Sequence, residues 1–139
     1  MTQEIRAKAS ELERVVKRVE ELREGGISHF LLRGDLASGK TTLVQAYVRS
    51  CGIQEPVTSP TFSLMHHYGS FIHHYDLYNK SLEELLALSL LDELQEAGIH
   101  FIEWGEEPIE RLLERLGFPL AIIEITPFEG GRNYRITHA

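Results

Sequence analysis

The chain has 139 residues and a formal net charge of −7, with 42% hydrophobic and 25% charged residues. This composition is typical of one soluble globular domain, and no apolar run approaches the roughly 20 residues that span a bilayer. The acidic balance argues against a stand-alone nucleic-acid binder, because such proteins need a basic surface. Cys51 is the only cysteine, which excludes an internal disulfide. The first 24 residues lack the apolar core of a signal peptide. We therefore expect a single cytoplasmic domain over residues 1–139, with no membrane association.

The first predicted helix begins at Ser10 and ends before Gly25. Ser10 and Glu13 have the spacing of a capping box, in which each residue satisfies an amide of the other. One apolar stripe follows at helical spacing: Leu12, Val15, Val16, Val19 and Leu22. A stripe of this width predicts a helix packed against a sheet.

Residues 34–42 read Gly-Asp-Leu-Ala-Ser-Gly-Lys-Thr-Thr and fit the phosphate-binding pattern G-x-x-x-x-G-K-[ST]. A loop of small residues lets backbone N–H groups converge on phosphate oxygens, and the following helix adds its positive end. Lys40 would reach the β- and γ-phosphates, and the Thr41 hydroxyl would bind Mg²⁺. Residues 29–32 read as a buried strand, and residues 43–48 have helical periodicity. The flanks therefore support a phosphate-binding loop (P-loop).

Residues 57–62 continue the chain as Val-Thr-Ser-Pro-Thr-Phe, directly after Pro56. Two prolines four residues apart predict a stiff, non-helical connection crowded with hydroxyl groups. In many P-loop enzymes the loop at this place senses the γ-phosphate. The alternative, which the residues leave open, is an ordinary turn.

Two strands are predicted next, over residues 62–68 and 71–78, joined by a short turn at Gly69. Their histidine pairs, at 66–67 and 73–74, do not predict a metal site. Neighbours on a strand point to opposite faces, and no cysteine accompanies them. Asp76 differs, because it ends an apolar strand where open α/β sheets keep their ligands. A capping role before a turn is the alternative.

A leucine-rich helix is predicted over residues 81–96, with Ser81 and Glu84 at capping-box spacing. Core packing is the favoured use of its leucines, and a partner-binding surface is the alternative. Residues 99–104 then form a buried strand that ends in Glu103. A P-loop protein places its acidic Walker B group there, so we predict that Glu103 is the carboxylate that holds Mg²⁺, directly or through water. The alternative is an exposed glutamate at a strand end.

The remaining elements are a helix that begins at Glu106-Glu107-Pro108 and two strands, 120–125 and 133–137, joined as a hairpin by residues 129–132. Alternating strands and helices around a P-loop predict an α/β fold. Specifically, we expect a P-loop NTPase-like three-layer sandwich. Its sheet would be mixed but mainly parallel, with antiparallel hairpins and with helices on both faces.

Four stretches in this order resemble the bacterial TsaE (YjeE) family, the ATPase component of tRNA threonylcarbamoyladenosine (t6A) synthesis. They are residues 34–42, Val57-Thr58-Ser59-Pro60-Thr61, His74-Tyr75-Asp76-Leu77-Tyr78, and Ile102-Glu103-Trp104. The resemblance covers nearly the whole chain. The P-loop alone is generic, whereas the ordered set of four is specific.

The resemblance implies a set of site residues. The nucleotide would be bound by Ala37, Ser38, Gly39, Lys40, Thr41 and Thr42, with Trp104, Glu106 and Arg132 beside it. Thr41 and Glu103 would hold Mg²⁺. Lys40, Asp76 and Thr42 would serve catalysis, with Asp76 orienting water or the metal shell. The 58–61 segment resembles the family's switch loop, and the adenine would lie near the start of the first helix, at Ser10 or Glu11.

Two positions depart from the family pattern. The family usually has glycine at Ala37, so we expect altered phosphate contact at that point. It often has arginine at Asn79, which puts any ionic or partner contact of that arginine in doubt.

The function that the resemblance implies is a Mg²⁺-dependent ATPase that supports turnover of a threonylcarbamoyl transferase complex with TsaB- and TsaD-type subunits. Contact with tRNA would be indirect or weak. Hydrolysis would be slow without partners, because the chain has few candidate arginine fingers, Arg132 being the best. A small P-loop kinase of a metabolite or nucleoside is the first alternative, although the chain has little length for an acceptor segment. A non-hydrolysing nucleotide-gated adaptor is the second.

Overall fold

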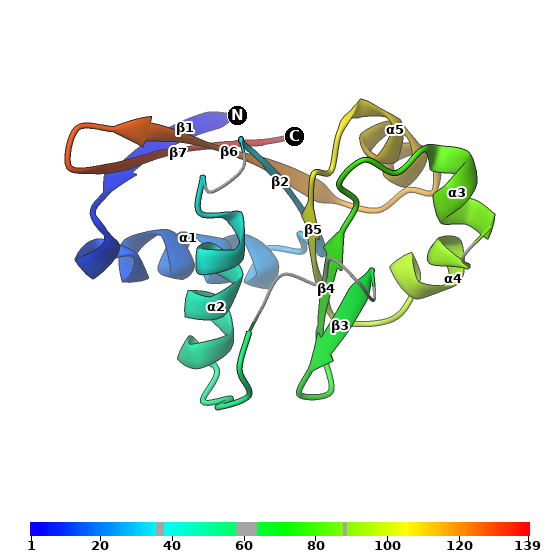
Figure 1. Ribbon diagram of the computed structural model, residues 1–139, viewed down its shortest axis with the longest axis horizontal. Helices are drawn as coiled ribbons and strands as arrows, with labels where there is room; N and C mark the ends of the chain where they lie inside the picture. The colour runs from blue at the N-terminus through cyan, green and yellow to red at the C-terminus, as the bar shows by residue number, and fades with distance from the viewer. Residues whose placement is uncertain (36–37, 58–63, 88) are drawn as a thin grey trace.

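The computed structural model describes residues 1–35, 38–57, 64–87 and 89–139. Seven strands form one sheet in the order β1-β7-β6-β2-β5-β4-β3 (Figure 1). The strands are β1 Thr2–Ala7, β2 His29–Arg33, β3 Met65–Tyr68, β4 Ile72–Asp76, β5 Ile99–Glu103, β6 Leu120–Phe128 and β7 Gly131–His138. The helices are α1 Glu13–Glu24, α2 Lys40–Ser50, α3 Leu82–Ala87, α4 Leu90–Leu94 and α5 Glu107–Arg115, with a 3₁₀ turn at Ala9–Glu11.

The four central strands, β6-β2-β5-β4, are parallel, and antiparallel strands extend the sheet on both sides. β3 pairs with β4 as a hairpin, and β7 and β1 continue from β6. The parallel strands β2 and β5 are buried along nearly their whole length, as expected for strands covered on both faces. The predicted mixed α/β sheet is confirmed, and its parallel part lies at the centre, where the carboxyl ends of β2, β4 and β5 share one edge.

Helices cover both faces of the sheet, which confirms the predicted three-layer sandwich (Figure 1). The larger core lies between the sheet and α1 and α2, around Phe30, Val44 and Phe101. The smaller core lies on the other face, where Leu85, Leu94 and Leu113 come from α3, α4 and α5. Among the described residues, no helix has both the length and the hydrophobicity needed to cross a bilayer.

The N-terminal region differs from the sequence-based expectation. Strand β1 was not predicted, and the helix begins at Glu13 after a 3₁₀ turn. The predicted Ser10–Glu13 capping box is wrong: Glu11 instead accepts a 3.0 Å hydrogen bond from the amide of Lys8. Strand β1 is an edge strand of the sheet, and the chain must change direction after it to begin α1. The 3₁₀ turn makes this change of direction.

The predicted helix over residues 81–96 is divided into α3 and α4. Its capping box is confirmed, because the Glu84 amide donates to Ser81 Oγ at 3.2 Å and the Ser81 amide donates to Glu84 Oε1 at 3.4 Å. The division lies at Ser89, whose φ of 63° is left-handed and interrupts a helix. The β6–β7 hairpin is longer than predicted and turns at Glu129-Gly130.

Candidate functional site

The predicted strand–loop–helix unit is present between β2 and α2. Gly39 stands immediately before α2 with φ 106°, a left-handed conformation that glycine adopts without a Cβ penalty. A Cβ there would lie 2.9 Å from the guanidinium of Arg132. The structure therefore brings Arg132, on β7, next to the start of the phosphate loop's helix. Ala37 lies outside the described residues, as does the 58–61 segment.

Lys40, the first residue of α2, points back over the loop. Its Nζ donates hydrogen bonds of 2.7 Å to the Gly34 carbonyl and 3.0 Å to the Asp35 carbonyl. It also lies 4.1 Å from the ring centroid of Trp104, a cation–π contact. Burial lowers the pKa of the Lys40 ammonium, and the negative charge of Glu103 opposes that shift. The ammonium is thus held in a partly desolvated position beside the loop.

Two buried carboxylates end neighbouring strands. Asp76 at the end of β4 pairs with Glu103 at the end of β5, so both side chains lie on the same face of the sheet. Thr41 donates from Oγ1 to Glu103 Oε2 at 2.8 Å. The main-chain amide of Tyr78 donates to Asp76 Oδ1 at 3.0 Å, which fixes one of its oxygens. The hydroxyl and the two carboxylates therefore converge at the edge where the P-loop lies.

His74 completes this cluster, and the sequence analysis assigned it no role. Its Nε2 lies 2.5 Å from Glu103 Oε2, and its ring is fully buried. This contact orients the Glu103 carboxylate toward Thr41. The available signal was strand alternation, because His74 and Asp76 are two residues apart and so share a face. His74 Nδ1 has no hydrogen-bond partner among the described residues.

Trp104 and Glu106 lie beside the P-loop but contact different groups. The left-handed backbone of Trp104, with φ 61°, turns the chain directly after Glu103. Its ring packs 4.8 Å from the ring of Tyr78, and both line a pocket of about 260 Å³ that also includes Glu106. Glu106 is exposed ahead of α5, and one of its oxygens lies 3.8 Å from Arg33 Nε.

Thr42 faces another way. It lines a groove of about 550 Å³ together with Ala9 and Ser10 from the 3₁₀ turn and Gln45 from α2. Ser38, on the other side of the loop, is buried, with its Oγ 3.3 Å from Lys40 Nζ. The groove extends from the start of α2 to the first helix, where the sequence analysis expected the adenine.

A phosphate loop between a parallel strand and a helix, with an acidic residue ending the neighbouring strand, defines a P-loop NTPase-like protein. The sequence model of the family described as "Threonylcarbamoyl adenosine biosynthesis protein TsaE" matches residues 3–132. The chain therefore belongs to the TsaE family.

Individual relatives agree with this assignment. A tRNA threonylcarbamoyladenosine biosynthesis protein TsaE from Nostoc is 42% identical over 88 residues, which are 57% of this chain and 53% of the relative. The protein of the same name from Treponema pallidum is 38% identical over 96 residues, covering 67% of this chain and 70% of the relative. The match thus spans about half of the Nostoc relative's length.

The fold has a solved counterpart. The crystal structure of YdiB from Bacillus subtilis superposes with a TM-score of 0.64 and covers 99% of this chain and 86% of its own. Its sequence identity is 19%, so this likeness concerns the fold.

Proposed function

We propose that this protein is a Mg²⁺-dependent ATPase that supports tRNA threonylcarbamoyladenosine synthesis, acting with a threonylcarbamoyl transferase complex of TsaB and TsaD type. The observation that carries the proposal is the 2.8 Å contact between Thr41 and Glu103 beside Lys40. One hydroxyl, one carboxylate and one ammonium thereby meet at the start of a helix, where phosphates bind. The names of the curated relatives supply the biosynthetic context.

The donor set fits magnesium. Mg²⁺ prefers octahedral oxygen ligands at roughly 2.0–2.1 Å, so two adjacent ligands lie about 2.9 Å apart. Thr41 Oγ1 and Glu103 Oε2, at 2.8 Å, have this separation. His74 would hold the carboxylate in that orientation, as residues behind metal ligands commonly do. A bound magnesium ion would neutralise charge on the phosphates.

Each remaining residue has a role that its position supports. Lys40 would release the Gly34 and Asp35 carbonyls and turn its ammonium to the β- and γ-phosphates. Asp76, buried beside Glu103, would accept a hydrogen bond from the attacking water and orient it. Arg132, against Gly39, is the arginine of this chain best placed to neutralise developing charge.

The groove along α2 would receive the nucleoside. Thr42 and Ser10 both line it, and a base there would lie next to the first helix. On this account Thr42 binds the nucleotide from the groove side rather than acting on the phosphates. Trp104, whose ring Lys40 Nζ already contacts at 4.1 Å, would pack beside the phosphates.

The decisive experiment reconstitutes the modification reaction. The transferase complex, tRNA and ATP are mixed with this protein or with Lys40→Ala, and modified tRNA is counted per complex. We expect multiple turnovers with the wild-type protein and no more than one with the variant. Equal yields with and without the protein would refute the proposal.

A variant of Asp76 distinguishes this ATPase from a nucleotide-gated adaptor. Asp76→Ala should lose ATP hydrolysis and keep much of its ATP affinity, as measured by phosphate release and calorimetry. An adaptor would have no hydrolysis to lose. Transfer of the γ-phosphate to a metabolite would instead identify a kinase.

A further inference from the structure

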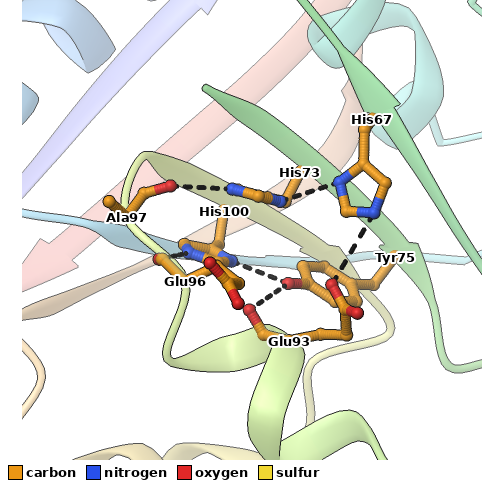
Figure 2. A network of polar contacts seen from close by, with 7 residues as sticks. All are labelled: His67, His73, Tyr75, Glu93, Glu96, Ala97 and His100. Carbon is orange, nitrogen blue, oxygen red and sulfur yellow. Dashed lines mark hydrogen bonds and ion pairs between the residues drawn. The ribbon is translucent and has the colours of Figure 1, made fainter. Parts of the chain in front are cut away.

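A second group of ligand-type side chains lies on the opposite face of β4 from Glu103 and His74. It consists of His67 on β3, His73 on β4 and Glu93 on α4, and one ligand atom from each lies within 4.8 Å of the others (Figure 2). His73 precedes His74 directly, so the two side chains point to opposite faces of the strand. The group is therefore separate from the proposed nucleotide site.

The hairpin register creates this group. Alternation separates His66 from His67 along β3, as the sequence analysis states. The antiparallel pairing, however, places His67 directly opposite His73 on the same face. Their Nδ1 atoms lie 2.8 Å apart, and His67 Nε2 lies 3.7 Å from Glu93 Oε2. Cross-strand pairing thus gathers two imidazoles beneath a carboxylate from a helix.

His73 is oriented as a metal-binding histidine. Its Nε2–H donates to the carbonyl of Ala97 at 2.9 Å, so the neutral ring keeps the lone pair of Nδ1 directed at His67. Its ring is buried and stacks on His100 with centroids 4.3 Å apart. A backbone carbonyl that fixes the tautomer from behind is the usual partner of a ligating imidazole.

The contacts of His67 favour a cation between the three side chains. The Nδ1 of His73 is an acceptor, so His67 must donate to it from its own Nδ1. In a neutral His67 the lone pair of Nε2 then faces the Glu93 carboxylate, and two acceptors oppose each other. A divalent cation bound to both Nδ1 atoms and to Glu93 removes this opposition, because the His67 proton then lies on Nε2, which can donate to the carboxylate.

We propose that His67, His73 and Glu93 bind one borderline divalent cation of the zinc class, with water as the fourth ligand. Zinc–nitrogen bonds of about 2.0–2.1 Å place tetrahedral ligands about 3.3 Å apart, so the two imidazoles must separate slightly from 2.8 Å. The side chain of His67 is 47% exposed and can rotate to allow this. Imidazole nitrogen selects zinc-class ions over Mg²⁺, which prefers oxygen.

The site would tie the β3–β4 hairpin to α4. His67 and His73 belong to the hairpin, and Glu93 belongs to a helix of five residues. Apart from side-chain packing, α4 is joined to β4 by hydrogen bonds such as that from the Tyr75 hydroxyl to the Glu93 carbonyl, at 3.2 Å. A cation that binds only the folded arrangement raises its stability by mass action.

The test is calorimetry of the full chain with zinc sulfate at pH 7.5, without nucleotide. We expect one zinc ion per chain, an affinity lowered at least about tenfold in His67→Ala and in Glu93→Gln, and no competition from millimolar Mg²⁺. His66→Ala and Glu96→Gln are matched controls from the same strand and the same turn. Both should keep the wild-type affinity. Glu103→Gln should also keep it, which separates this site from the nucleotide site.

Thermal unfolding provides a second measurement if one variant is poorly folded. Zinc should raise the midpoint of the wild-type protein and of both matched controls, and at the same zinc concentration it should raise that of Glu93→Gln by less. The proposal would be overturned if no zinc bound at 100-fold excess over the protein. It would also be overturned if His67→Ala and Glu93→Gln both bound zinc with the wild-type affinity. In either case ordinary hydrogen bonding between the three side chains would account for the contacts.

Discussion

Lowering the pH from 7.5 to 5.5 is expected to destabilise the fold through two buried histidines, His29 and His100. Their rings stack with centroids 4.3 Å apart and are 1% and 0% exposed. Burial lowers the pKa of His29 from 6.5 to about 4 and the pKa of His100 to about 3. Both rings are therefore neutral in the folded protein at pH 5.5, whereas the unfolded chain protonates them.

The sign and size follow from proton linkage. Because the folded-state pKa is depressed, stability is complete above pH 6.5 and is lost as the pH falls from 6.5 toward the folded-state values. Each pH unit in that window costs about 1.4 kcal/mol per histidine. The free energy of unfolding should thus fall by about 3 kcal/mol for the pair between pH 7.5 and 5.5. Most carboxylates titrate below this range.

Urea unfolding at pH 7.5, 6.5 and 5.5, followed by the fluorescence of Trp104, measures this loss. His100→Asn removes one of the two titrating rings and should roughly halve the pH-dependent part, whatever its effect on overall stability. His138→Ala, at the end of β7 and away from this pair, is the control and should leave the pH dependence unchanged. A free energy of unfolding that stays constant from pH 7.5 to 5.5 would refute the reasoning.

Three further substitutions test the site and the core. Glu103→Gln should lower the apparent affinity for Mg²⁺ in the presence of ATP by at least about tenfold, as measured by calorimetry. An unchanged magnesium titration would contradict the assignment of Glu103 to the metal. Gly39→Ala should lose about 1–2 kcal/mol in thermal unfolding and most of its ATP affinity, because its φ is 106° and a Cβ meets a guanidinium. Gly52→Ala, with φ 78° and open space around it, is the matched control and should keep ATP binding. Tyr47→Phe should lose about 1 kcal/mol in urea unfolding, since its hydroxyl donates a 2.8 Å hydrogen bond to a carboxylate of α1; equal stability would argue against that bond.

The P-loop unit could be predicted because its signals are local. The motif at residues 34–42, the apolar strand before it and the periodic helix after it are all contiguous in the sequence. The position of Glu103 at the end of a strand could be predicted for the same reason, since this residue directly follows a short apolar run. In the structure Thr41 and Glu103 are in contact although 62 residues separate them, because β2 and β5 are neighbouring parallel strands.

Strand β1 could not be predicted from its own residues. Only Ile5 and Ala7 of its six residues are buried, so the segment resembles an exposed, charged terminus. Its stability comes from pairing with β7, more than 120 residues away. The left-handed Ser89 that divides α3 from α4 is a similar case, because residues 81–96 read as one helical pattern with no local signal for a break.

The alternation of side chains along β4 has a mechanical consequence. His74 contacts the carboxylate of Glu103 on one face, and His73 contacts His67 on the other. The two rings are attached to consecutive Cα atoms, so β4 cannot slide or tilt without moving both. A displacement of β4 that shifts His73 therefore also shifts His74, and with it the carboxylate of Glu103 that contacts Thr41.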